Sequence, residues 1–293
     1  MGGLVRHGAR RFRAAHLVFG HGTRNARDEA AYLALRALNL PLDTTAGDLD
    51  RPVDAHDARR VLSLFERRVR SRKPAAYLTR EAWLGDFRFH VDERVVVPRS
   101  HIAGLLRENL APWMPDRRAI RSILDLCTGS GCLAVLLAHS FPGARIDATD
   151  TSSAALAVAR MNVGKYRLTR RIRLIKSDLF SALGGKQYDL IVSNPPYVTT
   201  AGMRRLPREY RHEPRVALAG GRDGLDMVRR ILLQAPAHLN PGGLLMVEVG
   251  RGRRRLEHAF PRVAFTWPEG AGGDAVFLVE REEIDRALAR SIS

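Results

Sequence analysis

Cysteine and long apolar runs are both scarce in this sequence of 293 residues. The two cysteines, Cys127 and Cys132, are too few for a disulfide framework and lack the CxxC spacing of a metal site. The longest apolar run, Cys132–Ala138, falls far short of the ~20 residues that a membrane span needs. We therefore predict a protein without a membrane span or a metal, located in the reducing cytoplasm.

Lysine is also rare, and the first fifteen residues contain no acid. Only four lysines are present, so arginine supplies the other 44 of the 48 cations, which against 31 acids give a net charge of +17. Residues 1–15 lack the serine content and apolar centre of a targeting signal, so we expect them to form a helix. This charge favours polyanionic partners, and arginine suits phosphate, although a genome rich in arginine codons would give the same composition. Charge alone therefore indicates no single function.

The first part of the chain combines helical patterns with one hairpin. Over residues 83–97 the apolar period changes to two around Gly85-Asp86, which predicts a β-hairpin. Pro112 and Pro115 mark the end of this part, so we predict a helical domain with a hairpin over residues 1–115. The helices predicted for it cover residues 1–15, 24–38 (with Thr23 as the cap) and 55–72.

Residues 116–293 alternate short apolar segments with helical ones. This alternation predicts an α/β fold, a mostly parallel sheet with helices on both faces. Ligands of such sheets bind beyond the carboxyl ends of the strands. The predicted strands are 123–126, 145–149, 172–175, 188–192, 244–249 and 275–279, and the main helices are 133–140, 154–163 and 225–239.

A glycine-containing segment, Asp125–Cys132, follows the first of these strands. Gly129 and Gly131 let the backbone turn tightly and approach a ligand, with the amino end of the next helix facing it. Asp150 ends the second strand, where it can accept both hydroxyls of a ribose, and Asp178 ends the third, near an adenine amino group. The pattern predicts a nucleoside-containing cofactor. It also satisfies the dinucleotide fingerprint, and helix capping is the alternative role for the aspartates.

The segment Asn194-Pro195-Pro196-Tyr197 directly follows the fourth predicted strand. The Asn194 side chain offers a carbonyl acceptor, and Pro195, which has no N–H, exposes its own carbonyl on an extended chain. Two convergent acceptors beside a cofactor suit a planar NH2 group, either an amide or an amino-nucleobase. The Tyr197 ring can lie against that plane. A proline-rich turn is the alternative, but the position after this strand favours a site for an NH2 substrate.

These two segments together resemble the seven-stranded, S-adenosylmethionine-dependent methyltransferases of amino nitrogens, and among them the HemK-type protein-glutamine methyltransferases. The resemblance covers nearly the whole chain. It is nearest to the branch (PrmB) that modifies the third large-subunit ribosomal protein, because Ser100 stands where the release-factor branch has a second proline. Arg80 departs from the family glycine, which costs stability if that backbone needs a positive φ. Other matching stretches are Phe19–Thr23, Pro74–Thr79, Glu81–Trp83, Val97–Ser100, Tyr210–Pro214 and Gly220–Leu225.

The resemblance implies a seven-stranded, Rossmann-like sheet, S-adenosylmethionine as methyl donor and a glutamine amide of that ribosomal protein as acceptor. The ribosomal protein is expected either free or on an rRNA-containing assembly intermediate. Catalysis is assigned to Asn194, Pro195, Pro196 and Tyr197. Arg99 and Glu213 lie on the substrate side, with a structural ion pair as the alternative for Arg99. The implied cofactor-binding residues are Asp125, Thr128, Gly129, Gly131, Asp150, Asp178, Leu179 and Asn194.

Four other functions fit parts of the pattern. An amino-nucleobase methyltransferase would use the same Asn-Pro-Pro-aromatic segment, but the chain has no additional domain to read a base sequence. A non-catalytic ribosome-assembly factor would not need intact cofactor residues, and a nicotinamide oxidoreductase would not need Asn194–Tyr197. A release-factor glutamine methyltransferase stays open as the sister reaction. Glutamine methylation of the ribosomal protein is the function we predict.

Overall fold

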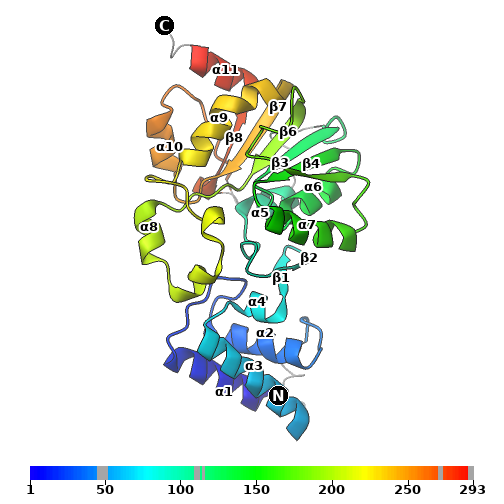
Figure 1. The fold of residues 1–293 in the computed structure, drawn as a ribbon, viewed down its shortest axis with the longest axis vertical. Coiled ribbons are helices and arrows are strands. Elements are labelled where there is room, and N and C mark those ends of the chain that lie inside the picture. The colour runs from blue at the N-terminus through cyan, green and yellow to red at the C-terminus, as the bar shows by residue number, and fades with distance from the viewer. Residues whose placement is uncertain (45–51, 109–112, 114–115, 270–272, 290–293) are drawn as a thin grey trace.

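The computed structural model describes residues 1–44, 52–108, 113, 116–269 and 273–289. A helical unit at the amino end, a short hairpin and an α/β sheet follow one another along the molecule (Figure 1). No helix in these described ranges combines the length and the apolar content required to cross a membrane.

The helical unit packs around its own apolar core. Phe12, Leu33 and Phe65 are fully or almost fully buried in it, and the two phenylalanine rings meet edge to face at 5.4 Å. Asn25, rather than the expected Thr23, caps the second helix through its side chain. The helices of this unit are α1 (Gly2–Ala14), α2 (Ala26–Ala37), α3 (Ala55–Ser71) and α4 (Ala75–Thr79).

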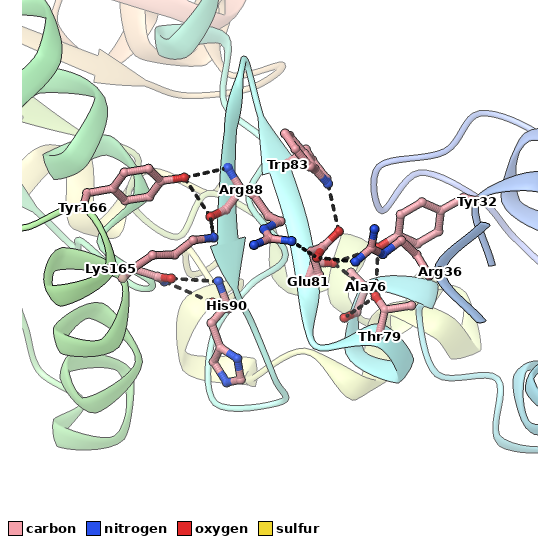
Figure 2. Close-up of polar contacts among 11 residues, drawn as sticks. Tyr32, Arg36, Ala76, Thr79, Glu81, Trp83, Arg88, His90, Lys165 and Tyr166 are labelled. Atoms are coloured by element: carbon pink, nitrogen blue, oxygen red, sulfur yellow. Dashed lines mark hydrogen bonds and ion pairs between the residues drawn. The ribbon is translucent and has the colours of Figure 1, made fainter. Parts of the chain in front are cut away.

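The predicted hairpin is present as β1 (Glu81–Leu84) and β2 (Phe87–His90), paired antiparallel around Gly85. Figure 2 shows it between two neighbours. On one side Glu81 pairs with Arg36 of α2 at 3.3 Å. On the other side the Tyr166 hydroxyl accepts from the backbone N–H of Arg88 at 2.8 Å. The hairpin therefore connects the helical unit to the sheet.

The main sheet has six strands in the order β5-β4-β3-β6-β7-β8. All neighbours pair in parallel except β7 and β8, which pair antiparallel. The seventh strand that the resemblance implied is reduced, among the described residues, to one antiparallel bridge between Thr266 and Leu278. The strands are β3 (Ser122–Leu126), β4 (Arg145–Asp150), β5 (Ile172–Lys176), β6 (Tyr188–Ser193), β7 (Leu239–Glu248) and β8 (Val276–Glu280).

Helices cover both faces of this sheet, as the alternating pattern predicted. Ile123 and Ile146 share a core with α6 and α7, whereas Leu124 and Leu126 share one with α9 and α11. Successive strand residues thus point to opposite faces. The remaining helices are α5 (His101–Arg107), α6 (Cys132–Ser140), α7 (Ser153–Lys165), α8 (Thr200–Arg205), α9 (Asp226–His238), α10 (Arg253–Ala259) and α11 (Arg281–Ala289).

The predicted boundary at residue 115, with Pro112 and Pro115, lies outside the described residues. Apolar packing divides the chain at an earlier position, between Ala75 and Ala76. Residues up to Ala75 belong to the core of the helical unit, whereas residues 76–106 contribute to the core of the sheet. The hairpin and α5 are therefore packed as parts of the α/β unit.

Candidate active site

A cavity of about 290 Å³ opens beyond the carboxyl ends of β3, β4 and β6. This is the edge where the sequence predicted a ligand. Of the predicted site residues, ten line the cavity: Arg99, Thr128, Gly129, Asp150, Asp178, Leu179, Asn194, Pro195, Pro196 and Tyr197. Three do not line it: Asp125, Gly131 and Glu213.

The glycine segment after β3 takes the conformation that its sequence requires. Gly129 and Gly131 have φ values of 55° and 77°. A Cβ on Gly129 would enter open space, so this glycine leaves room for a ligand. A Cβ on Gly131 would instead lie 3.1 Å from the Cβ of Ala159, so this glycine allows α6 to pack on α7. The two glycines thus have different roles.

Asp150 fixes the glycine segment from the neighbouring strand. One carboxylate oxygen accepts from the Gly129 backbone N–H at 2.9 Å, and the other accepts from that of Ser152 at 2.8 Å. Each oxygen can accept a further hydrogen bond. Burial raises the pKa of Asp150, while these backbone N–H groups act against the rise. The carboxylate can therefore bind the glycine segment and a ribose together.

Asp125 lies beneath the glycine segment and is fully buried. Its carboxyl accepts from the Thr128 hydroxyl at 2.5 Å. Burial raises its pKa to about 7. This side chain supports the segment from below and does not face the cavity.

The backbone at the ends of two strands is held in the left-handed region. Cys127 follows β3 with a φ of 59°, and Leu179 follows β5 with a φ of 51°. Non-glycine residues adopt this conformation rarely, and it is concentrated at functional sites. Asp178, beside Leu179, pairs at the surface with Arg230 at 2.8 Å. These turns direct the chain around the rim of the cavity.

Asn194 follows β6, and its side-chain N–H group donates to the carbonyl of Arg99 at 3.4 Å. This bond directs the amide oxygen of Asn194 away from Arg99, where it can accept from a ligand. Pro195, Pro196 and Tyr197 continue along the cavity wall. The acceptors anticipated from the sequence therefore line one cavity with the glycine segment.

Glu248, which the sequence analysis missed, supports the site from behind the residues that line the cavity. It ends β7, is almost completely buried, and accepts from the Ser100 hydroxyl at 2.7 Å and the His101 backbone N–H at 3.0 Å. The Tyr197 hydroxyl donates to its second oxygen at 3.4 Å. Burial raises the pKa of Glu248 and of Tyr197. An acid at the carboxyl end of a strand, as in Asp150, was the signal that could have found it.

Arg99 and Glu213 form a bidentate ion pair, with distances of 2.6 and 2.7 Å. Glu213 is buried, also accepts from the Val97 backbone N–H, and lies 3.7 Å from His21. Arg99 acts against the effect of burial and holds the pKa of Glu213 at about 2. The structural ion pair, the alternative for Arg99, is therefore present, and Arg99 lines the cavity as well.

Tyr210 joins this ion pair to the helical unit. Its ring lies 4.2 Å from that of His21, and the Arg99 guanidinium lies 5.3 Å from the ring centroid. A Cβ on Gly20 would come within 2.5 Å of the Tyr210 hydroxyl, which explains the need for glycine in the Phe19–Thr23 stretch. This side of the cavity is thus built against the amino-terminal part of the chain.

The residues at the cavity fit S-adenosylmethionine. Gly129 leaves open space at the cavity wall, and the Asp150 carboxylate retains acceptor capacity for a ribose. Leu179 and Met227 offer apolar contacts near Asp178 for an adenine. Polar groups for the nucleoside therefore lie on one side of the cavity, and the Asn194–Tyr197 segment lies on the other.

Comparison with known proteins agrees with this geometry. Residues 105–206 match the family described as Methyltransferase small domain. The catalytic domain of hMettl16, solved in complex with MAT2A 3'UTR hairpin 1, superimposes with a TM-score of 0.50 over 86% of this chain and 90% of that chain. Its sequence is 19% identical, so this likeness concerns the fold alone.

Curated relatives match over nearly the full length and carry the name ribosomal protein uL3 glutamine methyltransferase. The protein from Neisseria meningitidis serogroup B (strain ATCC BAA-335 / MC58) is 54% identical, covering 96% of this chain and 93% of the relative. The protein from Bordetella pertussis (strain Tohama I / ATCC BAA-589 / NCTC 13251) is 52% identical, covering 96% and 95%. The protein from Burkholderia pseudomallei (strain K96243) is 50% identical, covering 96% and 94%. This chain belongs to the family of ribosomal protein uL3 glutamine methyltransferases.

Proposed function

We propose that this protein transfers a methyl group from S-adenosylmethionine to the side-chain amide nitrogen of a glutamine in ribosomal protein uL3. The observation that carries the proposal is the placement of Asn194–Tyr197 in one cavity with Gly129 and Asp150. The names of the full-length relatives support the same reaction and substrate.

The chemical difficulty is that an amide nitrogen is a poor nucleophile, because its lone pair is delocalised into the carbonyl. Asn194 Oδ1 and the Pro195 carbonyl would accept the two N–H bonds of the substrate amide. That arrangement directs the lone pair out of the amide plane and stabilises positive charge as it develops on nitrogen. The Tyr197 ring, whose hydroxyl is held by Glu248, would support the amide plane from one side.

When bound, the methyl donor supplies a sulfonium-activated carbon; S-adenosylhomocysteine is the leaving group, and the amide nitrogen releases one proton after attack. The protein's task is therefore placement. Asp150 and the Gly129 backbone would hold the nucleoside, and Asp178 with Leu179 would hold the adenine. The Arg99–Glu213 pair fixes the Pro-Arg stretch beside Asn194. These contacts make Arg99 and Glu213 positioning residues.

A second part of the proposal concerns the form of the substrate and the place of the reaction. A net charge of +17 favours uL3 held on rRNA in an assembly intermediate, because rRNA supplies the opposite charge. The reaction would take place in the cytoplasm. The amino-terminal residues 1–115, as a recognition domain, would contact the ribosomal protein.

The test is a side-by-side incubation of the purified protein with labelled S-adenosylmethionine and unmethylated uL3, release factor or duplex DNA. Peptide mapping by mass spectrometry then locates the label. Label on a glutamine of uL3 alone is the expected result. Label on the release factor would assign the protein to the sister reaction. Label only in DNA would show that the NH2 group held by Asn194 belongs to a base.

A further inference from the structure

Six exposed arginines lie on the segment that borders the mouth of the active-site cavity. The segment runs from Thr200 to Arg222, through α8 and two short 3-10 helices, and passes beside the sheet towards the amino-terminal helices (Figure 1). Leu206, Tyr210 and Val216 of the same segment line the cavity. We call the exposed arginines the arginine rim; they are Arg204, Arg205, Arg208, Arg211, Arg215 and Arg222.

The two acids of this segment point inward and are already paired. Glu209 is fully buried, pairs with Arg72 at 2.7 Å and accepts from the Val18 backbone N–H at 3.2 Å. Glu213 is buried in its ion pair with Arg99. The carboxylates therefore attach the segment to the protein, and the charged side chains left on its outer surface are all cations.

Surface arginines elsewhere in the described ranges are of two kinds: some pair with a neighbouring acid, and others, such as Arg10 and Arg118, have side chains with no partner there. Arg173 pairs with Asp147 at 2.7 Å, and Arg253 pairs with Glu257 at 3.0 Å. Among the described residues, none of the six rim side chains has an ion-pair or hydrogen-bond partner. The rim is distinguished by its place, because its six arginines share one segment beside the cavity and the two acids of that segment are buried. Like charges on one short segment repel each other where they lie within a screening length of about 8 Å, and an anionic partner would relieve that repulsion.

We propose that the arginine rim binds the phosphate backbone of RNA next to the uL3 segment that enters the active site; this rests on the function proposed above. A protein that binds rRNA neutralises phosphates with its own lysines and arginines, so a cationic rim would repel free uL3. RNA between the two removes that repulsion. Arginine is also the side chain best suited to phosphate, through its rigid set of donors. An acidic protein is the competing partner, and the experiment includes it.

The chain offers a matched control for charge removal. Arg145, Arg160 and Arg170 are also exposed and without a partner among the described residues, but they line a hollow at the amino ends of β3, β4 and β5. That hollow lies at the opposite edge of the sheet from the active site. In the rim variant, Arg204, Arg208 and Arg215 are replaced by Gln. In the control variant, Arg145, Arg160 and Arg170 are replaced by Gln. The two variants therefore lose equal charge at opposite edges of the sheet.

The full-length proteins are titrated against a fluorescein-labelled RNA hairpin at several salt concentrations, with polyglutamate as the acidic-protein probe. We expect the rim variant to bind RNA at least about tenfold more weakly than wild type. The slope of its plot of log affinity against log salt concentration should be smaller in magnitude by about three. The control variant should bind close to wild type. Lys at the three rim positions should preserve the salt slope, because a point charge still contacts phosphate. Circular dichroism checks that every variant is folded.

Equal losses of RNA affinity in the rim and control variants would overturn the proposal, because only the total charge of the protein would then matter. Unchanged RNA binding by the rim variant would overturn it too, as would tighter binding of polyglutamate than of RNA. With uL3 as substrate, wild type should methylate the RNA-bound form faster than the free form, and the rim variant should lose this preference. If the wild-type protein methylated no form of uL3 while the rim variant still bound RNA more weakly than the control variant, the proposed function would be wrong. RNA binding by the arginine rim would then still be supported.

Discussion

Single residues at this site are held in backbone conformations that most side chains avoid. Cys127, Leu179 and Arg80 all have φ values between 51° and 59°. At Cys127 and Leu179 the turn shapes the cavity wall, so the strain serves the site. At Arg80, which ends α4, the side chain is exposed and forms no hydrogen bond or ion pair among the described residues. The sequence-based expectation that Arg80 occupies a position suited to glycine is therefore confirmed by its φ of 54°.

Replacing Arg80 by Gly should raise the free energy of unfolding by about 0.5–1 kcal/mol, because glycine adopts this backbone without steric cost. Arg72 provides the control, with a φ of 55° but a guanidinium that pairs with Glu209 and donates to the carbonyls of Ala15 and His16. Replacing Arg72 by Gly should lower stability by about 2 kcal/mol. Chemical denaturation measures both, and a destabilised Arg80→Gly protein would contradict the backbone argument.

Asp125 makes stability depend on pH. Burial raises its pKa to about 7 from a reference value of 3.8, so the folded state keeps a proton that the unfolded state has lost. Its contribution to stability is therefore largest at low pH and is lost as the pH rises towards 7. When the pH is raised from about 5 to about 8, the titration of this one group should lower the free energy of unfolding by about 3 kcal/mol.

The variant Asp125→Asn removes that titration, so it should gain stability relative to wild type as the pH is raised. Denaturation curves at the two pH values test this. A stability difference between wild type and variant that does not change with pH would mean that Asp125 is ionised in the folded protein.

At the scale of secondary-structure elements, the hairpin is bound to the glycine segment through one buried side chain. Asn162 of α7 accepts from the His90 backbone N–H at 2.7 Å and donates to the carbonyls of His90 and Ser130 at 3.0 and 2.8 Å. Asn162→Ala leaves these backbone groups without partners, so we expect a loss of about 2–3 kcal/mol. Titration calorimetry should also show weaker binding of S-adenosylmethionine, because Ser130 lies in the glycine segment.

Tyr166 is the matched control on the same helix. Its hydroxyl bonds to the backbone of Arg88 at 2.8 and 2.9 Å, in an exposed position that water can reach. Tyr166→Phe keeps the ring packed on Phe87 and Phe89 and should cost less than about 1 kcal/mol. Equal effects of the two substitutions would show that Asn162 has no special part in supporting the glycine segment.

Local sequence patterns predicted the positions of the helices and strands well, but they did not predict which distant side chains contact each other. Five of the six strands of the main sheet and the helices over 24–38 and 55–72 lie within two residues of their expected bounds, because periodicity and caps are local. The exception is β7, which begins at Leu239, five residues before the expected start. Asn25 replaced Thr23 as a cap because the helix begins two residues later. The links from Glu248 to Ser100 and from Glu213 to Arg99 join residues over 100 positions apart, and no local pattern encodes them.

At the scale of the whole molecule, the packing suggests where the chain can be divided. Residues 76–106 share a core with the sheet, so a fragment that begins at Lys73 retains both sheet cores. We expect this fragment to fold and bind S-adenosylmethionine but to lose methylation of uL3, because the proposed recognition domain is mostly absent. A fragment that begins at Asp116 should not fold, since it lacks the hairpin and α5. If the shorter fragment were as stable as the longer one, the domain boundary would lie at 115.

The function could be predicted from the sequence because its chemistry is carried by contiguous segments at strand ends. Asn194–Tyr197 and Gly129 line the cavity as expected. Asp125, Gly131 and Glu213, which were assigned to the same site, do not line the cavity, since a motif match does not reveal which of its members face inward. The arginine rim was visible only as net charge, because the fold alone shows that Glu209 and Glu213 turn away from it.

The central claim is that Asn194, which the resemblance also assigns to cofactor binding, acts mainly on the substrate amide. The most direct test measures the single-turnover rate of uL3 methylation and the Kd for S-adenosylmethionine in Asn194→Ala, beside Asp150→Ala. We predict that Asn194→Ala slows methyl transfer by about 100- to 1,000-fold while the Kd stays near wild type. Asp150→Ala should instead raise the Kd and recover rate at saturating S-adenosylmethionine. An Asn194→Ala protein with a wild-type rate, or with a Kd raised as much as its rate is lowered, would contradict the account.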